Sequence, residues 1–250
     1  MKNLFRNKRT GLLLLAAFLL LVMLMSLLFN HIDLMGEVGD ASGLAFTLMT
    51  DSAGSQGFVI SLALLIAVTW RMVGTRLRLV SLMAQLGLLL VVGFAAKTGL
   101  KQMTESPRPY TELLTQQLLI PQPSHFYKLN KQQQAQVIEQ ISTRVSLWRT
   151  HHWQGETDYS FPSGHTIFAS ICLAIFGSLF IEYKRFGLAA MLVGWALMVA
   201  YSRLWSGMHR PADLIGSIVF VGLVYLVVPN CQRLSERLFS TLVSYQPKTK

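Results

Sequence analysis

The chain is built from long apolar blocks separated by polar segments. Blocks of about 16 to 20 apolar residues are long enough to cross the hydrocarbon core of a bilayer as helices. We therefore predict an all-α integral membrane protein. Its six predicted transmembrane helices are residues 11–29, 54–70, 79–100, 164–181, 186–201 and 211–228.

One long polar segment, residues 101–162 (the insertion), separates the third and fourth predicted helices. It is too polar to cross a membrane, and we predict a largely helical extramembrane insertion within a single membrane-embedded domain, residues 1–250. Apolar residues recur in it at helical spacing, at Val137, Ile138, Ile141, Val145 and Trp148. This pattern fits an amphipathic helix on the membrane surface or over a site, and it also fits a small unit with its own packing. A further short helix is predicted at residues 44–49.

The composition supports this class, because 52% of the residues are hydrophobic and only 14% are charged. A typical soluble domain carries about 25% charged residues. The net charge of +10 does not indicate nucleic-acid binding, since the basic residues cluster at the ends of the apolar blocks. Such clusters mark the cytoplasmic ends of membrane helices, and they place both termini in the cytoplasm. The residues used are Lys2, Arg6, Lys8, Arg9, Arg71, Arg76, Arg78, Lys184, Arg185, Arg233, Arg237, Lys248 and Lys250.

The N-terminal apolar run resembles a signal peptide, but it is long for one and no small-residue cleavage site follows it. We expect it to remain as the first membrane helix. Cys172 and Cys231 lie too far apart in the predicted topology to form a disulfide, and neither has metal-ligand spacing. No cofactor is expected.

Three polar clusters end or begin predicted helices on the same, outer side of the membrane. They are residues 101–109, 161–165 and 202–213. Apolar helices do not need such clusters in order to fold. Because the predicted topology brings them to one depth on one side, we expect them to form one site.

The cations in these clusters suit an anionic ligand. The guanidinium groups of Arg108 and Arg203 match phosphate oxygens in two-point geometry, and Lys101 adds a point charge. Ser163 is a good helix N-cap, and Gly164 lets a ligand approach the backbone. The helix start then offers free N–H groups and a positive dipole end to an anion.

The histidines suit acid–base and nucleophilic chemistry. His209 and Asp213 are four residues apart, which places both side chains on one face at a helix start. An aspartate bonded to one imidazole nitrogen leaves the other nitrogen free to attack. His165 lies in the first turn of the fourth predicted helix, where a titrating histidine beside an anion is favoured over a permanent cation.

Simpler interpretations apply to each residue alone. A single arginine at a helix end is usually an anchor to the membrane interface, and a lone histidine in a loop usually has no special role. We interpret Lys97 as such an anchor. Glu105, Glu156 and Asp158 border the clusters, where they either orient a cation, bind the leaving group or are merely solvated. Arg210 is left without a role.

The combined pattern resembles the three-part signature of the type 2 phosphatidic acid phosphatase superfamily, and in particular its bacterial phosphatidylglycerophosphatase B group. The matching parts are Lys101-x6-Arg108-Pro109, Pro162-Ser163-Gly164-His165 and Ser202-Arg203-x5-His209-x3-Asp213. The resemblance extends to the topology, with six membrane helices and an insertion between the first and second parts.

The resemblance implies metal-independent dephosphorylation of membrane lipids. His209 would be the nucleophile and form a phosphohistidine, Asp213 would orient it, and His165 would protonate the leaving group. The residues that would hold the phosphate oxygens are Lys101, Arg108, Ser163, Gly164 and Arg203. It also implies the bacterial inner membrane, with the insertion and the site facing the periplasm and with no obligate protein partner. The implied substrates are phosphatidylglycerophosphate, phosphatidic acid, lysophosphatidic acid, diacylglycerol pyrophosphate and undecaprenyl pyrophosphate.

Other functions are compatible with parts of this pattern. A phosphotransferase would use the same site to pass phosphate to a lipid or a sugar. A transporter of anions or lipids would need polar residues along the membrane helices, and these offer mainly Ser, Thr, Gln85 and Lys97. The vanadate-dependent haloperoxidases share the motif but are soluble proteins.

Overall fold

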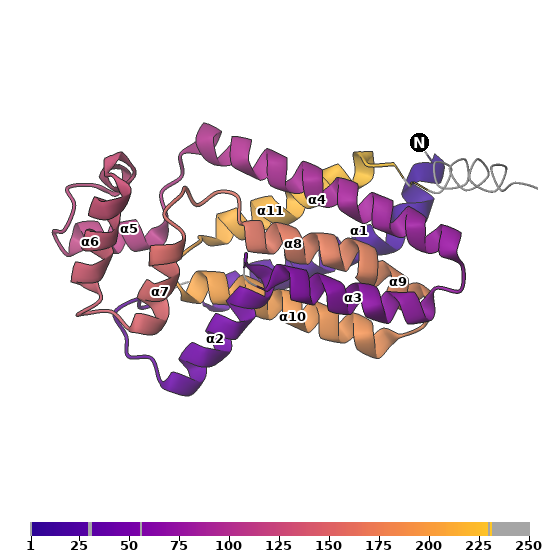
Figure 1. Cartoon of the computed structure of the whole chain (residues 1–250), viewed down its shortest axis with the longest axis horizontal. Helices are drawn as coiled ribbons and strands as arrows, with labels where there is room; N and C mark the ends of the chain where they lie inside the picture. The colour runs from indigo at the N-terminus through magenta and orange to yellow at the C-terminus, as the bar shows by residue number, and fades with distance from the viewer. Residues whose placement is uncertain (1, 30–31, 56, 230, 232–250) are drawn as a thin grey trace, which may run out of the picture.

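The structure is a computed structural model that describes residues 2–29, 32–55, 57–229 and 231. Its regular elements within these ranges are helical, and the long ones run side by side along one axis (Figure 1). Those of the membrane bundle are α1 (Lys2–Leu28), α2 (Asp40–Ala53), α3 (Phe58–Met72), α4 (Arg76–Thr104), α8 (Gly164–Cys172), the π-helical turn η2 (Leu173–Gly177), α9 (Ser178–Glu182), α10 (Phe186–Trp205) and α11 (Pro211–Val227). Those of the insertion are α5 (Pro109–Gln116), the 3-10 helix η1 (Pro123–Lys128), α6 (Lys131–Ile141) and α7 (Leu147–Gly155).

All six predicted apolar blocks are helical, but they do not all have the length of a membrane span. Within the described part of the chain, four runs are long and apolar enough: Lys8–Leu28, Arg76–Gln116, Gly164–Glu182 and Phe186–Trp205. A fifth is reached if α2 and α3, which meet at an angle of 70°, count as one broken span. The last block forms α11, an apolar helix of only 17 residues. The structure therefore supports a multi-pass helical membrane protein, and the number six stays a prediction. The basic residues after position 231 lie outside the described residues.

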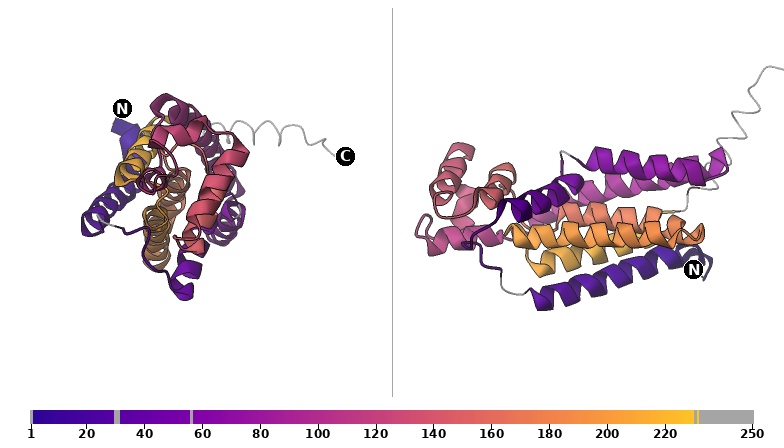
Figure 2. Two further views of the ribbon diagram at one scale, coloured as in Figure 1. Left: turned by 90° about the vertical axis from the view of Figure 1, so that its left-hand side faces the viewer. Right: turned by 90° about the horizontal axis from the view of Figure 1, so that it is seen from below.

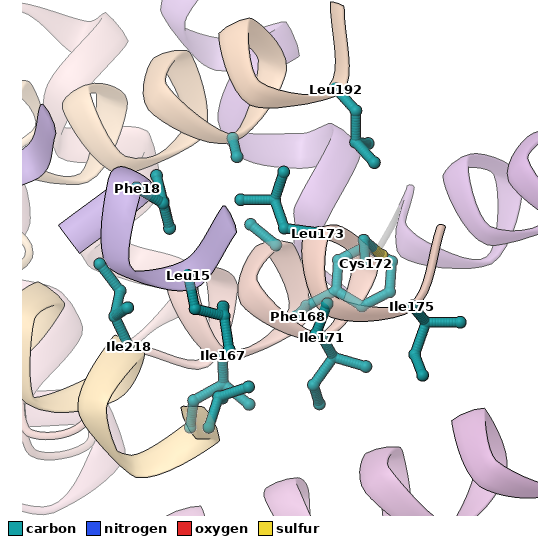
Figure 3. Packing of buried hydrophobic residues seen from close by; sticks show 14 of the residues in the cluster. Leu15, Phe18, Ile167, Phe168, Ile171, Cys172, Leu173, Ile175, Leu192 and Ile218 are labelled. Atoms are coloured by element: carbon teal, nitrogen blue, oxygen red, sulfur yellow. The ribbon is translucent and has the colours of Figure 1, made fainter. Parts of the chain in front are cut away.

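The run from α8 to α9 forms the centre of the bundle. Its side chains are the most deeply buried of the four long runs. Figure 3 shows Phe168 and Leu173 of this run surrounded by Phe18 of α1, Leu192 of α10 and Ile218 of α11. Helices packed on every side of α8 hold its first turn in place, and that turn carries Gly164 and His165.

The insertion forms a small unit at one end of the bundle (Figures 1 and 2). The predicted helix over residues 137–148 is split between α6 and α7, and the insertion has a hydrophobic cluster of its own. In that cluster Tyr110 stacks on Trp153 with ring centroids 5.0 Å apart. The Trp153 indole donates to the Ser206 carbonyl oxygen at 2.6 Å. The structure therefore agrees with a unit that has its own packing, and that unit is bonded to the loop that carries His209.

The short helix predicted at residues 44–49 is the middle of the longer α2. Gly54 ends α2 beside His165. A Cβ atom there would lie 2.9 Å from the Nε2 atom of His165. Glycine thus allows the end of α2 to approach His165 closely.

Candidate functional site

The predicted site residues lie where the ends of the bundle helices meet the insertion. Lys101 is in the last turn of α4 and Arg108 directly precedes α5. Arg203 is near the end of α10, while His209 lies in the loop that leads into α11. All four side chains are buried, although each carries polar or charged atoms. Burial of so many charges requires close partners.

His209 is held by the first turn of α11. Gly207 has φ 69°, a left-handed conformation that lets the chain turn after α10, and Pro211 then starts α11. The His209 Nδ1 atom lies 3.5 Å from the Asp213 Oδ2 atom. That carboxylate oxygen also accepts a hydrogen bond from the Arg210 backbone N–H at 2.8 Å. The i to i+4 spacing therefore brings the two side chains together as predicted.

Burial lowers the pKa of His209 to about 3, against the hydrogen bond to Asp213, which raises it. The positive charges of Arg108 and Arg203 lower it further. The imidazole is therefore neutral near pH 7. A neutral imidazole has a free lone pair on one nitrogen, which a nucleophile needs.

The two arginines are fully buried but differ in how well they are satisfied. Arg108 donates from Nε to the Asp158 carbonyl oxygen at 2.7 Å and from Nη1 to the Met208 carbonyl oxygen at 3.1 Å. Arg203 donates from Nη2 to Glu156 at 2.7 Å. Its Nε and Nη1 atoms have no hydrogen-bond partner among the described residues. Buried N–H groups without a partner cost free energy, so the Arg203 guanidinium group is suited to donate further hydrogen bonds to anionic oxygens.

Two carboxylates from the insertion lie among these cations. Glu156 bridges Arg203, at 2.7 Å from Oε1, and Arg108, at 3.2 Å from Oε2. Asp158 bridges Arg108, at 2.5 Å, and the Lys101 ammonium, at 2.8 Å. The sequence alone allowed three roles for these two acids: orienting a cation, binding the leaving group, or lying in solvent without a specific partner. The structure places both carboxylates in direct contact with the cations that we predicted to bind phosphate.

These contacts keep both carboxylates ionised. Burial raises the pKa of Glu156, but the charges of Arg203 and of other nearby basic groups outweigh it and hold the pKa well below its usual value. Burial also raises the pKa of Asp158, and here Arg108 and Lys101 lower it to about 2. Each acid is therefore a full negative charge at neutral pH.

The start of α8 completes the site. The Nε2 atom of His165 is 3.9 Å from Oε1 of Glu156. Ser163 caps α8, since its side-chain oxygen accepts from the Thr166 backbone N–H at 3.4 Å. The Ser163 backbone N–H donates to Ser217 at 2.9 Å and is therefore not free for a ligand. These contacts leave the hydroxyl proton of Ser163 available to donate to a ligand.

A cavity of about 480 Å³ opens beside these groups. Its charged and titratable lining residues include Lys101, Glu156, His165 and His209, and its apolar lining residues include Phe58 of α3 and Phe94 of α4. Gly164 also lines it.

Lys97 lies in the wall of the same cavity, with its Nζ atom 5.6 Å from the centroid of the Phe94 ring. The structure thus places Lys97 beside the site, whereas we interpreted it as an interfacial anchor. Glu105 is exposed at the end of α4, in agreement with a solvated side chain.

The structure adds residues that the sequence did not single out. Ser160 contacts both His209 and Asp213, and Ser217 joins the Ser163 backbone to the Asp213 carbonyl oxygen. Serines are common and neither belongs to the signature, so no local signal marked them. Arg210 contacts Glu112 at 2.5 Å and the Pro107 carbonyl oxygen. It ties the start of α5 to the start of α11 and lies outside the cation cluster.

Fold and site together describe a helical membrane protein with buried cations and a histidine–aspartate couple at the end of its bundle. The chain matches the PAP2 superfamily over residues 81–237 and belongs to it. The resemblance inferred from the three motifs is thereby confirmed.

Three relatives are similar to parts of this chain. The chain is 34% identical to phosphatidylglycerophosphatase B of Haemophilus influenzae over 151 residues, which are 57% of this chain and 62% of that protein. It is 34% identical to phosphatidylglycerophosphatase B of Escherichia coli K12 over 158 residues, 61% of each chain. It is 39% identical to the undecaprenyl-diphosphatase BcrC of Bacillus subtilis over 62 residues, 25% of this chain and 30% of that protein. The matched regions thus cover about three fifths of the two phosphatidylglycerophosphatases.

Proposed function

We propose that this protein is a membrane lipid phosphatase that removes terminal phosphate from lipid monoesters and pyrophosphates through a phosphohistidine on His209. One observation carries the proposal. Three buried cations contact the carboxylates of the insertion, beside a neutral histidine, His209, that lies next to Asp213. Carboxylates are anions with two oxygens, and they occupy the position that a phosphate group would take.

Phosphate binding is an exchange of anions. A phosphate monoester dianion offers three terminal oxygens and two negative charges, where Glu156 offers two oxygens and one charge. The third phosphate oxygen can accept hydrogen bonds from Arg203, because its Nε and Nη1 atoms have no partner among the described residues. Glu156 leaves the cations as the substrate enters, and the phosphate then contacts Lys101, Arg108 and Arg203.

In the first step, His209 attacks phosphorus through Nε2. The N–P bond forms as the bond from phosphorus to the leaving oxygen breaks. That oxygen takes a proton from His165, which enters this step as an imidazolium beside the bound phosphate anion. Asp213 stabilises the positive charge that develops on His209. Positioning of the two groups supplies roughly 7–11 kcal/mol of the barrier reduction.

In the second step, water attacks the phosphohistidine and His165 accepts its proton. The N–P bond breaks, and inorganic phosphate leaves with neutral His209 restored. Lys101, Arg108 and Arg203 neutralise the equatorial oxygens in both steps, which is the role that metal ions have in many phosphoryl transfers. One well-aimed donor contributes about 3–4 kcal/mol. The proposed reaction uses no metal ion.

The substrates are lipids whose head group carries a terminal phosphate. The names of the relatives point to phosphatidylglycerophosphate and undecaprenyl diphosphate, and the superfamily pattern adds phosphatidic acid, lysophosphatidic acid and diacylglycerol pyrophosphate. The cavity between Phe58 of α3 and Phe94 of α4 supports lateral entry, in which the acyl chains stay in the bilayer. A short-chain soluble ester should accordingly be a poor substrate, and equal turnover of both would contradict lateral entry.

The proposed setting is a bacterial inner membrane, crossed six times within a single domain over residues 1–250. Both termini then lie in the cytoplasm, and the insertion and site face the periplasm. The insertion lies at one end of the bundle, which supports its placement on a single side of the membrane (Figure 2).

Phosphate release by the purified protein from a panel of lipid mono- and pyrophosphates tests the proposal, with His209→Ala as control. We expect release that persists in excess EDTA and that the control lacks. Activity lost in EDTA and restored by a divalent ion would overturn the metal-free mechanism. Repeating the assay with a lipid or sugar acceptor separates hydrolysis from phosphotransfer, because a transferase forms a phosphorylated acceptor.

A further inference from the structure

Ser160 lies at the end of the insertion, next to the histidine–aspartate couple. Its side chain is fully buried. Its backbone N–H donates to the Ser106 carbonyl oxygen at 2.8 Å, which ties this part of the insertion to the segment that carries Arg108. The hydroxyl oxygen is 2.5 Å from Asp213 Oδ2, 3.3 Å from His209 Nδ1 and 3.2 Å from the Met208 carbonyl oxygen.

One hydroxyl group has a single proton and can donate only one strong hydrogen bond. The shortest contact, to the ionised carboxylate of Asp213, takes that proton because bonds to charged acceptors are the strongest. The lone pairs of the oxygen are then free to accept from the Nδ1–H of His209. Direct contact between Nδ1 and Oδ2 of Asp213 is longer, at 3.5 Å. The serine hydroxyl is thus nearer to the imidazole nitrogen than the carboxylate is.

We propose that Ser160 is a positioning residue that links Asp213 to His209 and keeps the Nδ1 atom of His209 protonated. With Nδ1 as donor, the lone pair stays on Nε2, where the attack on phosphorus starts. The proposal deepens the function proposed above and rests on it. It assigns to the insertion a direct part in orienting the nucleophile.

A purely structural role makes different predictions. A buried serine that only satisfies neighbouring polar groups affects folding stability and acts independently of Asp213. A serine that acts through the couple affects turnover at unchanged substrate binding. Its effect also shrinks once an uncharged amide replaces the carboxylate that accepts its hydrogen bond, because residues that act as a unit are not additive.

The test measures kcat and KM of Ser160→Ala and Ser160→Thr on a lipid phosphate monoester, alone and combined with Asp213→Asn. We expect Ser160→Ala to lower kcat about 10- to 100-fold with KM within about 2-fold, and Ser160→Thr to retain most activity through its hydroxyl. In the Asp213→Asn background, Ser160→Ala should cost less than about 3-fold. Ser26→Ala is the matched control, since Ser26 is a buried serine of α1 whose hydroxyl donates to the Val22 carbonyl oxygen of its own helix and not to the histidine–aspartate couple.

Near-wild-type kcat in Ser160→Ala, or equal losses with and without Asp213→Asn, would overturn the positioning role. If Ser160→Ala does not fold, Ser160→Cys keeps nearly the same volume with a much weaker hydrogen-bonding group and is held to the same criteria. The proposed function fails separately, if His209→Ala retains turnover. In that case the effect of Ser160 has no bearing on a phosphohistidine.

Discussion

The two sides of the site are held in different ways. On the nucleophile side, Asp213 is bonded to the Arg210 backbone N–H and to the Ser160 hydroxyl, and neither partner is a mobile charge. On the phosphate side, the cations are bonded mainly to Glu156 and Asp158, carboxylates that the insertion brings in. The first side is held by partners without a net charge, and the second by carboxylates, which the substrate phosphate replaces under the proposed function.

This difference follows from the energetics of buried charge. Arginine side chains removed from water need counter-ions, and a buried cation left alone destabilises the fold. A phosphate site that is empty must therefore be neutralised by the protein itself. The nucleophile side has no such requirement, because neutral His209 can stay in place in both states.

Removing the nucleophile should have the largest effect. We expect His209→Ala to lower phosphate release at least about 10⁴-fold, since no other group can form the covalent intermediate. Samples incubated with ³²P-labelled lipid and quenched in alkaline detergent, which preserves the N–P bond, should contain labelled wild-type protein and unlabelled variant. Label retained on His209→Ala would place the intermediate on another residue.

Changing the unsatisfied arginine should have the next largest effect. We expect Arg203→Lys to lower kcat/KM about 10²- to 10³-fold, because lysine cannot give the two-point contact of a guanidinium group. Arg78→Lys is the matched control, since Arg78 also pairs with a glutamate, Glu182, but at the opposite end of the bundle. A loss below about 3-fold in Arg203→Lys would mean that Arg203 does not bind the phosphate.

Removing the charge of Glu156 should have a smaller effect of opposite sign on binding. In Glu156→Gln, phosphate no longer competes with an anion, and we expect the inhibition constant of inorganic phosphate to fall about 5- to 10-fold. Glu182→Gln, which removes a carboxylate from the Arg78 pair, is the control and should leave this constant unchanged. An unchanged or higher constant in Glu156→Gln would show that the carboxylate does not occupy the phosphate position.

The pH dependence of stability should show the smallest effect. The pKa of His209 is about 3 in the folded protein, against an ordinary value of 6.5. Between these values the unfolded chain binds a proton that the folded chain lacks, so stability falls as the pH drops through this window. We expect the melting temperature of His209→Ala in detergent to fall less steeply than that of the wild type between pH 6.5 and 4.5, by up to about 3–5 °C per pH unit. Parallel curves would show that His209 is not held neutral by its surroundings.

Hydrophobic blocks and motif spacing were enough to predict the apolar helices and the candidate groups at the site. Spacing alone related His209 to Asp213, because residues four apart on a helix share a face. The positions of Lys101, Arg108 and Arg203 at helix ends on one side were enough to predict that they meet. The same reasoning did not reach the bend after α2 or the division of the insertion helix, because these depend on packing against neighbours.

The neutralisation of the site and the orientation of His209 depend on contacts between distant parts of the chain. Glu156 meets Arg108 and Arg203 from 48 and 47 residues away, and Ser160 meets Asp213 from 53 residues away. Contacts between residues so far apart have no periodicity in the chain. They arise because the insertion packs its own small core, with Tyr110 and Trp153, against the loop before α11. Long-range packing of this kind therefore sets which acid neutralises which cation, whereas local spacing sets which residues share a helix face.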